Sequence, residues 1–214
     1  MHTGKTRENR IRNLAGLRIA AACAAAFFLV SCGRKDSPRQ ESTVVVSRNG
    51  AFSVTSVESF DESLYSREEL EQRIDEELKA LSTADGEKSS VEFVKLEVKN
   101  GKAALLMNYD SASDYASFND TVAYFGTVHY ASLEGYDLSP LLSVPSQVES
   151  DVLLSSAELE RLGNHSLVII SEPVLVELPS DIMYCTENAR VTDKRKAAIQ
   201  DAVSELNPAM FILK

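Results

Sequence analysis

Residues 94–107, VKLEVKNGKAALLM, carry the clearest structural signal in this chain of 214 residues. Asn100-Gly101 is a preferred pair for a type I′ turn, because both central residues of that turn have positive φ. Folding about this turn matches three apolar pairs on one face of a hairpin: Val98 with Ala103, Leu96 with Leu105, and Val94 with Met107. The matched register predicts a hairpin whose apolar face must be covered. Val91 and Phe93 are out of phase with Val94, which indicates a bulge near Phe93.

A helix over residues 67–81 is the nearest candidate for that cover. Ser66 followed by Glu69 forms a capping box. Apolar residues recur at spacings of four, four and three and form one stripe: Leu70, Ile74, Leu78 and Leu81. Acidic residues lie away from the stripe, and two interpretations are open for them. They form either a solvated helix surface or a cation-binding face.

Shorter elements are expected further along the chain. Asp110 or Ser111 caps a short helix that ends near residue 119, and Ser155 or Ser156 caps another that ends near residue 162. Gly126 interrupts a strand over residues 121–128. A turn-rich stretch follows over residues 134–147, where prolines block regular structure.

Four short β-rich runs complete the prediction, over residues 166–171, 174–178, 182–186 and 210–213. Strands and helices do not alternate regularly, which favours antiparallel packing over a doubly wound parallel sheet. The predicted fold class is therefore α+β, a single domain over residues 43–214. It consists mainly of an antiparallel sheet with a few covering helices.

Composition excludes several classes of protein. The hydrophobic share of 44% and the charged share of 25% are typical of a globular chain. A net charge of −10 argues against a nucleic-acid partner, which requires a basic surface. No apolar run approaches the roughly 20 residues that a membrane-spanning helix needs.

The charge is distributed unevenly along the chain. Residues 1–31 contain five bases and one acid, so the remainder has a net charge of −14. An apolar stretch of twelve residues, 19–30, follows the basic head. A basic head followed by an apolar run of this length is typical of a secretory signal peptide, which is removed from the mature protein.

The residues after the apolar run are more specific. Leu29-Val30-Ser31-Cys32 resembles the lipobox of bacterial lipoproteins. The resemblance implies that Cys32 receives diacylglycerol at its sulfur and that a type II signal peptidase cleaves before it. The mature N-terminus would then carry fatty acyl chains such as palmitate and hold the protein on the extracytoplasmic face of the cell membrane. Residues 32–42 are polar and are expected to form a lipidated, flexible tether.

Candidate catalytic groups are few. His129 and His165 are the histidines of the expected mature chain, and Cys185 is its second cysteine. None stands in a recognised catalytic or metal-binding spacing. Cys185 is either a thiol nucleophile or a core residue, and its apolar surroundings in the sequence favour the core. We therefore expect no catalytic residue, no metal ligand and no cofactor-binding residue, and no cofactor.

The densest aromatic patch contains Tyr124, Phe125, Tyr130 and Tyr136, close to His129. It either stacks on a sugar or peptide ligand or belongs to the core. The segment 119–128 (NDTVAYFGTV), the later Gly135-Tyr136-Asp137 and the closing FILK also resemble uncharacterised lipoproteins of clostridial bacteria, and this resemblance implies no activity. Two functions stay open: a non-catalytic module that binds a protein, peptide or glycan at the cell envelope, and an envelope hydrolase of unfamiliar type.

Overall fold

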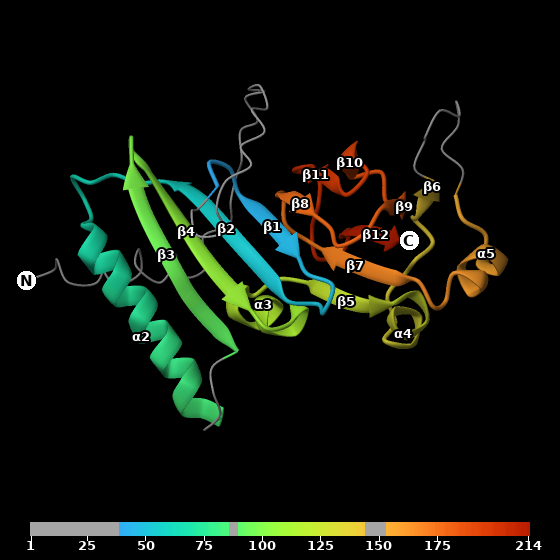
Figure 1. Ribbon diagram of the computed structural model, residues 1–214, viewed down its shortest axis with the longest axis horizontal. Helices are drawn as coiled ribbons and strands as arrows, with labels where there is room; N and C mark the ends of the chain where they lie inside the picture. Colours follow the sequence, from blue (N-terminus) through green and yellow to red (C-terminus); the bar gives the residue numbers. More distant parts are fainter. Residues whose placement is uncertain (1–38, 86–89, 144–152) are drawn as a thin grey trace, which may run out of the picture.

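The computed structural model describes residues 39–85, 90–143 and 153–214, and gives side chains for these except residues 81–85 and 142–143. The signal-peptide and lipobox residues, Cys32 included, lie outside this range. The described residues form an α+β domain, as the sequence predicts, and they contain two sheets rather than one, together with four helices. The helices are α2 (Arg67–Asp85), α3 (Ala112–Asn119), α4 (Val128–Leu133) and α5 (Ser156–Arg161) (Figure 1).

The larger sheet has seven strands in the order β10-β11-β8-β1-β2-β4-β3. Only β1 and β8 pair in parallel within it. In chain order the strands are β1 (Thr43–Val46), β2 (Phe52–Ser59), β3 (Val91–Lys99), β4 (Lys102–Tyr109), β8 (Leu175–Glu177), β10 (Ala189–Asp193) and β11 (Lys196–Ile199).

The smaller sheet has five strands in the order β5-β7-β12-β9-β6, all antiparallel. They are β5 (Ala123–Thr127), β6 (Leu142–Ser143), β7 (Ser166–Ile170), β9 (Ile182–Cys185) and β12 (Ala209–Leu213). The central strands β7 and β12 are buried on both faces, which explains why their sequences are almost continuously apolar.

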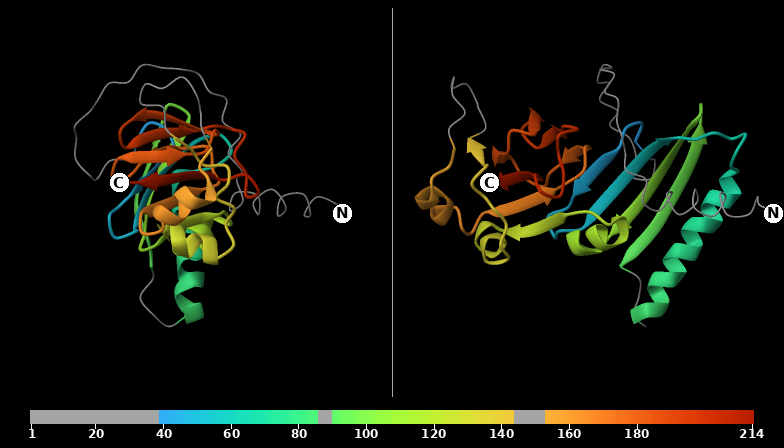
Figure 2. Two further views of the ribbon diagram at one scale, coloured as in Figure 1. Left: turned by 90° about the vertical axis from the view of Figure 1, so that its right-hand side faces the viewer. Right: turned by 180° about the vertical axis from the view of Figure 1, so that it is seen from behind.

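Two cores lie on opposite faces of the smaller sheet. The intersheet core contains one face of each sheet, with Phe52, Val168 and Phe211 among its members. The second core contains the opposite face of the smaller sheet, including Ile169 and Ile212, together with residues from α4 and from the segments around α5. The domain is therefore layered, with the larger sheet and α4–α5 on opposite sides of the smaller sheet (Figure 2).

The hairpin predicted to turn at Asn100-Gly101 is β3–β4. Asn100 and Gly101 have φ values of 55° and 70°, as a type I′ turn requires. Val98 pairs with Ala103 and Leu96 with Leu105, which confirms two predicted pairs. The third is wrong: Phe93, not Val94, opposes Met107, because the register shifts between Phe93 and Lys95. The expected bulge thus leaves Val94 unmatched and 37% exposed.

Helix α2 has the predicted cap and three residues of the predicted apolar stripe, while the side chain of Leu81 lies outside the described part of the structure. Ser66 and Glu69 exchange the two hydrogen bonds of a capping box, at 2.9 and 3.1 Å. Ile74 is buried in the intersheet core, and Leu70 and Leu78 pack against that core half-buried. The helix contacts β3 at the end of the long axis opposite α5 (Figure 1). The helix therefore covers the hairpin, as expected.

The start of α3 decides between the two caps that the sequence allows. Ser111, not Asp110, is the N-cap, and its hydroxyl oxygen accepts a hydrogen bond from the backbone N–H of Asp114. The Asp114 carboxylate accepts hydrogen bonds from the hydroxyls of Ser111 and Ser90. Asp114 therefore ties the first turn of α3 to the residue before β3.

Gly126 does not interrupt its strand, because β5 pairs with β7 continuously from Ala123 to Thr127. A Cβ atom at Gly126 would lie only 2.2 Å from the Tyr124 hydroxyl oxygen. That hydroxyl donates a hydrogen bond to the carbonyl oxygen of Thr127 at 3.2 Å. Glycine is thus needed here for the close approach of a side chain.

Candidate functional site

The two candidate histidines lie at one corner of the domain, where α4 begins beside β7. The backbone N–H of Val128 donates to the carbonyl of His165, and the N–H of His129 donates to Gly163. The His129 side chain is exposed beside Tyr130, with 5.7 Å between the ring centroids. Nδ1 of His165 is buried and, among the described residues, has no hydrogen-bond partner. These backbone hydrogen bonds bring together the two chain segments that carry His129 and His165.

Cys185 does not belong to this corner. Its strand β9 is separated from β7 by β12, so adjacent-strand spacing alone places the two strands about 10 Å apart. The thiol is buried in the intersheet core and lies 3.8 Å from the carbonyl oxygen of Ala189. The core interpretation of Cys185 fits this position.

The aromatic patch is divided between several environments. Phe125 packs against the intersheet core, and Tyr124 is buried in the second core with its ring centroid 5.2 Å from that of Tyr136. Tyr130 is 61% exposed and Leu133, one helical turn further along α4, is 69% exposed. The exposed part of the patch is therefore a small surface on α4, made of His129, Tyr130 and Leu133.

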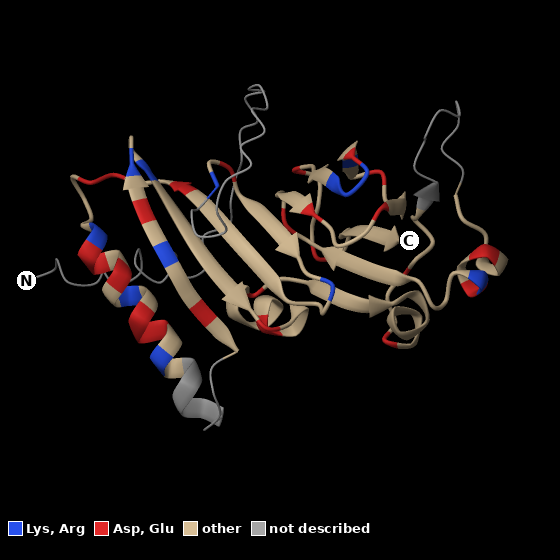
Figure 3. Ribbon diagram, in the orientation of Figure 1, with Lys and Arg blue, Asp and Glu red and all other residues tan. Residues whose placement is uncertain are grey.

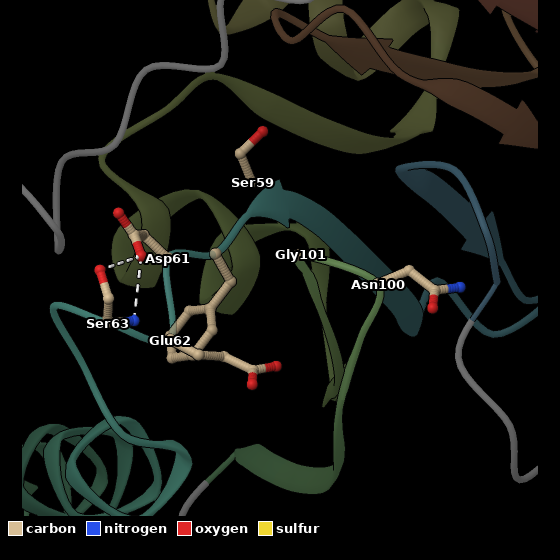
Figure 4. Close-up of a pocket in the computed structure, with 7 residues that line it drawn as sticks. Ser59, Asp61, Glu62, Ser63, Asn100 and Gly101 are labelled. Carbon is tan, nitrogen blue, oxygen red and sulfur yellow. Dashed lines mark hydrogen bonds between the residues drawn. The ribbon is translucent and has the colours of Figure 1, made fainter.

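A hollow of about 640 Å³ lies where β2 ends beside the β3–β4 turn (Figure 4). It is lined by Ser59, Phe60, Asp61, Glu62, Ser63, Asn100 and Gly101. Hydrogen bonds from the hydroxyl and backbone N–H of Ser63 lower the pKa of Asp61, which is fully solvated. These hydrogen bonds belong to a local turn, so the turn itself explains the lowered pKa of Asp61.

Acidic side chains on α2 engage neighbouring bases on the same helix. Arg67 pairs with Glu71 at 2.8 Å, and Arg73 pairs with Glu77 at 3.2 Å. Basic and acidic residues are interspersed along α2 (Figure 3). These are exposed i,i+4 pairs of the kind that supports a solvated helix surface. Within the described ranges, no group of three or more histidines, cysteines and carboxylates is placed to hold a metal ion.

Burial perturbs one carboxyl group strongly. Glu172 lies between β7 and β8, and burial raises its pKa from 4.5 to about 7. Burial also raises the pKa of the Tyr109 phenol to about 12, and the nearby Glu172 charge adds to that shift. The Tyr109 hydroxyl oxygen accepts a hydrogen bond from the Asn119 amide at 3.2 Å. No local sequence pattern indicates this pair, because Glu172 and Tyr109 are distant in the chain.

The end of the expected tether is attached to the larger sheet. The backbone N–H of Arg39 donates to the Thr55 hydroxyl at 3.4 Å, and its guanidinium pairs with Glu177 at 2.6 Å. The Ser42 hydroxyl oxygen accepts from the backbone N–H of Val57 at 3.0 Å. Residues 39–42 are therefore held in place by specific contacts. Sequence reasoning treated the whole of residues 32–42 as tether because these partners lie in other strands.

Comparison with known proteins finds no matching family model, no matching curated protein and no matching solved structure. A search of the described helices for a long apolar membrane span also finds none. Function therefore has to be argued from the residues of this chain.

Proposed function

We propose that this chain is a bacterial lipoprotein, anchored through Cys32 to the extracytoplasmic face of the cell membrane, whose domain acts by binding. The observation that carries the proposal is the order of features in residues 1–32: a basic head, twelve apolar residues and Leu-Val-Ser-Cys. This order is typical of a secretory signal that ends at a lipidated cysteine. The thiol is required because a thiolate is the nucleophile that accepts the glyceryl group.

Anchoring through two acyl chains is physically sufficient for stable attachment. Each buried CH₂ group contributes about 0.8 kcal/mol, so that one chain binds marginally and two bind firmly. The domain that follows the tether has its own cores and needs no contact with lipid to fold. The anchor and the domain are therefore separable parts of the proposed protein.

The binding part of the proposal is supported by the surface of α4. Tyr130 and Leu133 are large apolar side chains at i and i+3, so they lie on one face of the helix. An exposed aromatic side chain beside an exposed histidine suits stacking and hydrogen bonding to a protein, peptide or glycan. Cys185 lies in a different layer, so a thiol–histidine pair would need it to leave the intersheet core.

The anchor is tested by expressing the full chain in a bacterial host and measuring the intact mass of the membrane-extracted protein. We expect cleavage before Cys32 and the added mass of diacylglycerol. Cys32→Ser should abolish that addition and leave the protein unprocessed or released. The matched control is Cys185→Ser, which should leave lipidation unchanged. An unmodified mature chain, or cleavage at another residue, would contradict the proposal.

The alternative, an envelope hydrolase, has its own test. Purified protein is incubated with envelope peptides and glycans, and products are followed by mass spectrometry. Turnover that stops in His129→Ala, His165→Ala or Cys185→Ala would show that the domain is a hydrolase and would overturn the binding proposal. Partner capture that survives the double histidine substitution, and weakens in Tyr130→Ala with Leu133→Ala, would support binding through α4.

A further inference from the structure

The larger sheet has an outer face, opposite the intersheet core, with an unusual charge. The strand register places alternate residues on it, and these include all the bases of the strands together with Arg39, which docks there. The bases are Arg39, Lys95, Lys99, Lys102, Arg190 and Lys196. The acids of the same face are Glu92, Glu97, Glu177 and Asp193, and Glu41 lies in the docked segment beside Arg39, so the face has an excess of one base. The chain from residue 32 onward carries −14, so its other surfaces are strongly acidic.

Ion pairs account for the acids near the middle of this face. Glu177 pairs with Arg39 at 2.6 Å and lies 3.7 Å from Lys196, and Glu97 pairs with Lys95 at 2.6 Å. Among the described residues, no ion pair engages Lys99, Lys102 or Arg190. Lys99 and Lys102 flank the β3–β4 turn at one end of the strand order, and Arg190 is on the edge strand β10 at the other end.

Between the two basic ends the outer face carries two groups of paired charges, Lys95 with Glu97, and Glu177 with Arg39 and Lys196, among uncharged residues. The register sets Thr43 opposite Thr55, Thr55 opposite Leu106, and Val57 opposite Ala104. Thr43 and Thr55 are each only 3% exposed and Leu106 is 6% exposed, so the middle of this face is covered. The unpaired charge lies at the two ends, where lysine and arginine can reach outward on long side chains.

The chain joins the domain on this same face. Thr55, Val57 and Glu177, which hold residues 39–42, are all outer-face residues. Seven residue steps separate Cys32 from Arg39, and these span at most about 25 Å when fully extended. The α4–α5 side lies beyond the smaller sheet, and each layer adds about 10 Å. A tether that starts on the outer face is too short to pass around the domain and present that far side to the anchor.

We propose that the outer face of the larger sheet is a docking surface for the anionic headgroups of the membrane that holds Cys32. This proposal rests on the lipid anchor proposed above. Lys99, Lys102 and Arg190 contact the headgroups, and the acidic α2 and the α4 surface point along or away from the membrane. Basic groups near an anionic bilayer are attracted to it, and this attraction falls off within a Debye length of the surface.

The test uses the full chain, expressed in a bacterial host and purified in detergent as the processed protein. It is reconstituted in vesicles of phosphatidylcholine with phosphatidylglycerol, or of phosphatidylcholine alone. A membrane-impermeant amine reagent is added, and labelling of each lysine is measured by peptide mass spectrometry. We expect labelling of Lys99 and Lys102 to fall several-fold in the anionic vesicles relative to detergent. Lys214 should be unchanged, and high salt should restore the labelling.

Charge reversal provides the specific comparison. Lys99→Glu with Lys102→Glu should abolish the protection of Lys196, which serves as the reporter on the same face. The matched control is Lys79→Glu with Lys214→Glu, which changes the net charge equally and should leave that protection intact. Circular dichroism verifies that both double variants are folded.

The outcomes separate the two proposals. An unmodified Cys32 in the purified protein overturns the anchor and the docking surface together. A lipidated protein whose Lys99 and Lys102 react as in detergent overturns the docking surface alone. Equal protection in anionic and neutral vesicles overturns the recognition of anionic headgroups.

Discussion

At the scale of single residues, Glu172 is a group with a strongly raised pKa that no local sequence pattern indicates. Ser171, beside it, is fixed by its hydroxyl, which lies 2.9 Å from the Thr121 hydroxyl and accepts from the backbone N–H of Val122. This anchored segment leads directly from β7 toward β8 and leaves the Glu172 carboxyl largely buried near Tyr109. A carboxyl in such surroundings is stabilised in its neutral form, because desolvation penalises the charge.

The position of Glu172 predicts a pH-dependent stability. Its pKa is about 7 in the folded protein and close to 4.5 in the unfolded chain, so between these values the folded state binds more protons. The free energy of unfolding should therefore fall as pH rises through this window, by up to about 3 kcal/mol. Glu172→Gln should flatten this dependence. Urea unfolding at about pH 5 and about pH 8 measures it.

The matched control is Glu205→Gln, at an exposed carboxylate, which should keep the dependence of the parent protein. Burial also raises the pKa of Glu58, so this group too makes the free energy of unfolding fall as pH rises. Glu172→Gln should therefore keep a smaller pH dependence of stability, which comes from Glu58. If the free energy of unfolding of Glu172→Gln depends on pH as strongly as that of the parent protein, the Glu172 carboxyl is not the source of this dependence.

Residue identity alone could not reveal these sites. Cys185 was interpretable from its apolar neighbours, and the structure places its thiol in the intersheet core. The surroundings of Glu172 and of Arg39 depend on strands that are far away in the chain. Charge and burial created by tertiary contacts leave no local pattern in a sequence.

At the scale of elements, local signals were the reliable ones. Capping boxes involve residues three apart, and the predicted box of Ser66 with Glu69 forms. Of the two caps predicted for α5, Ser155 is the N-cap, and it also forms a capping box with Glu158. Turn chemistry likewise located β3–β4 and most of its register. The predicted strands over residues 166–171, 174–178, 182–186 and 210–213 correspond to β7, β8, β9 and β12.

Other elements were missed for physical reasons. Helix α4 has six residues and contains β-branched and aromatic side chains, so neither length nor propensity marks it. Strands β10 and β11 form a short, charged edge hairpin with a register shift. The signal for β2 was present, because FSVTSVES alternates between inward and outward residues, and for β1 it was the β-branched run TVVV. Only the pairing with β8 and β4 makes them the centre of a sheet.

Helix α2 offers a prediction at this scale. It reaches the intersheet core through Ile74 as its buried residue, with Leu70 and Leu78 half-buried beside it. Ile74→Ala should cost about 2–3 kcal/mol and should act first on α2, since a peripheral helix can open without the rest of the domain. Hydrogen exchange should show faster amide exchange in α2, while β7 and β12 stay protected.

The control for this experiment is the exposed neighbour Asp75→Ala, which should leave the exchange of α2 almost unchanged. Unaltered exchange in Ile74→Ala would mean that the helix is held by contacts other than its apolar stripe.

At the scale of the whole molecule, β12 joins the two cores. Successive residues of a strand point to opposite faces, and here each face belongs to a different core. Phe211 lies in the intersheet core and Ile212 in the second core, and both are completely buried. Strand β7 is shared in the same way through Val168 and Ile169. Because the same backbone supports both cores, neither core can open far without disturbing the other.

This shared strand predicts that the domain unfolds as one unit. Ile212→Ala removes side-chain volume from the second core only, at a cost of about 2–5 kcal/mol. If the cores are coupled, the Cys185 thiol in the intersheet core should react faster with a thiol reagent, by the factor that this loss of stability sets. Leu206→Ala, at a side chain that is 99% exposed, is the control and should leave the rate unchanged. A Cys185 thiol that stays protected in Ile212→Ala, while amides around Leu138 and Leu141 exchange faster, would show that the cores open separately.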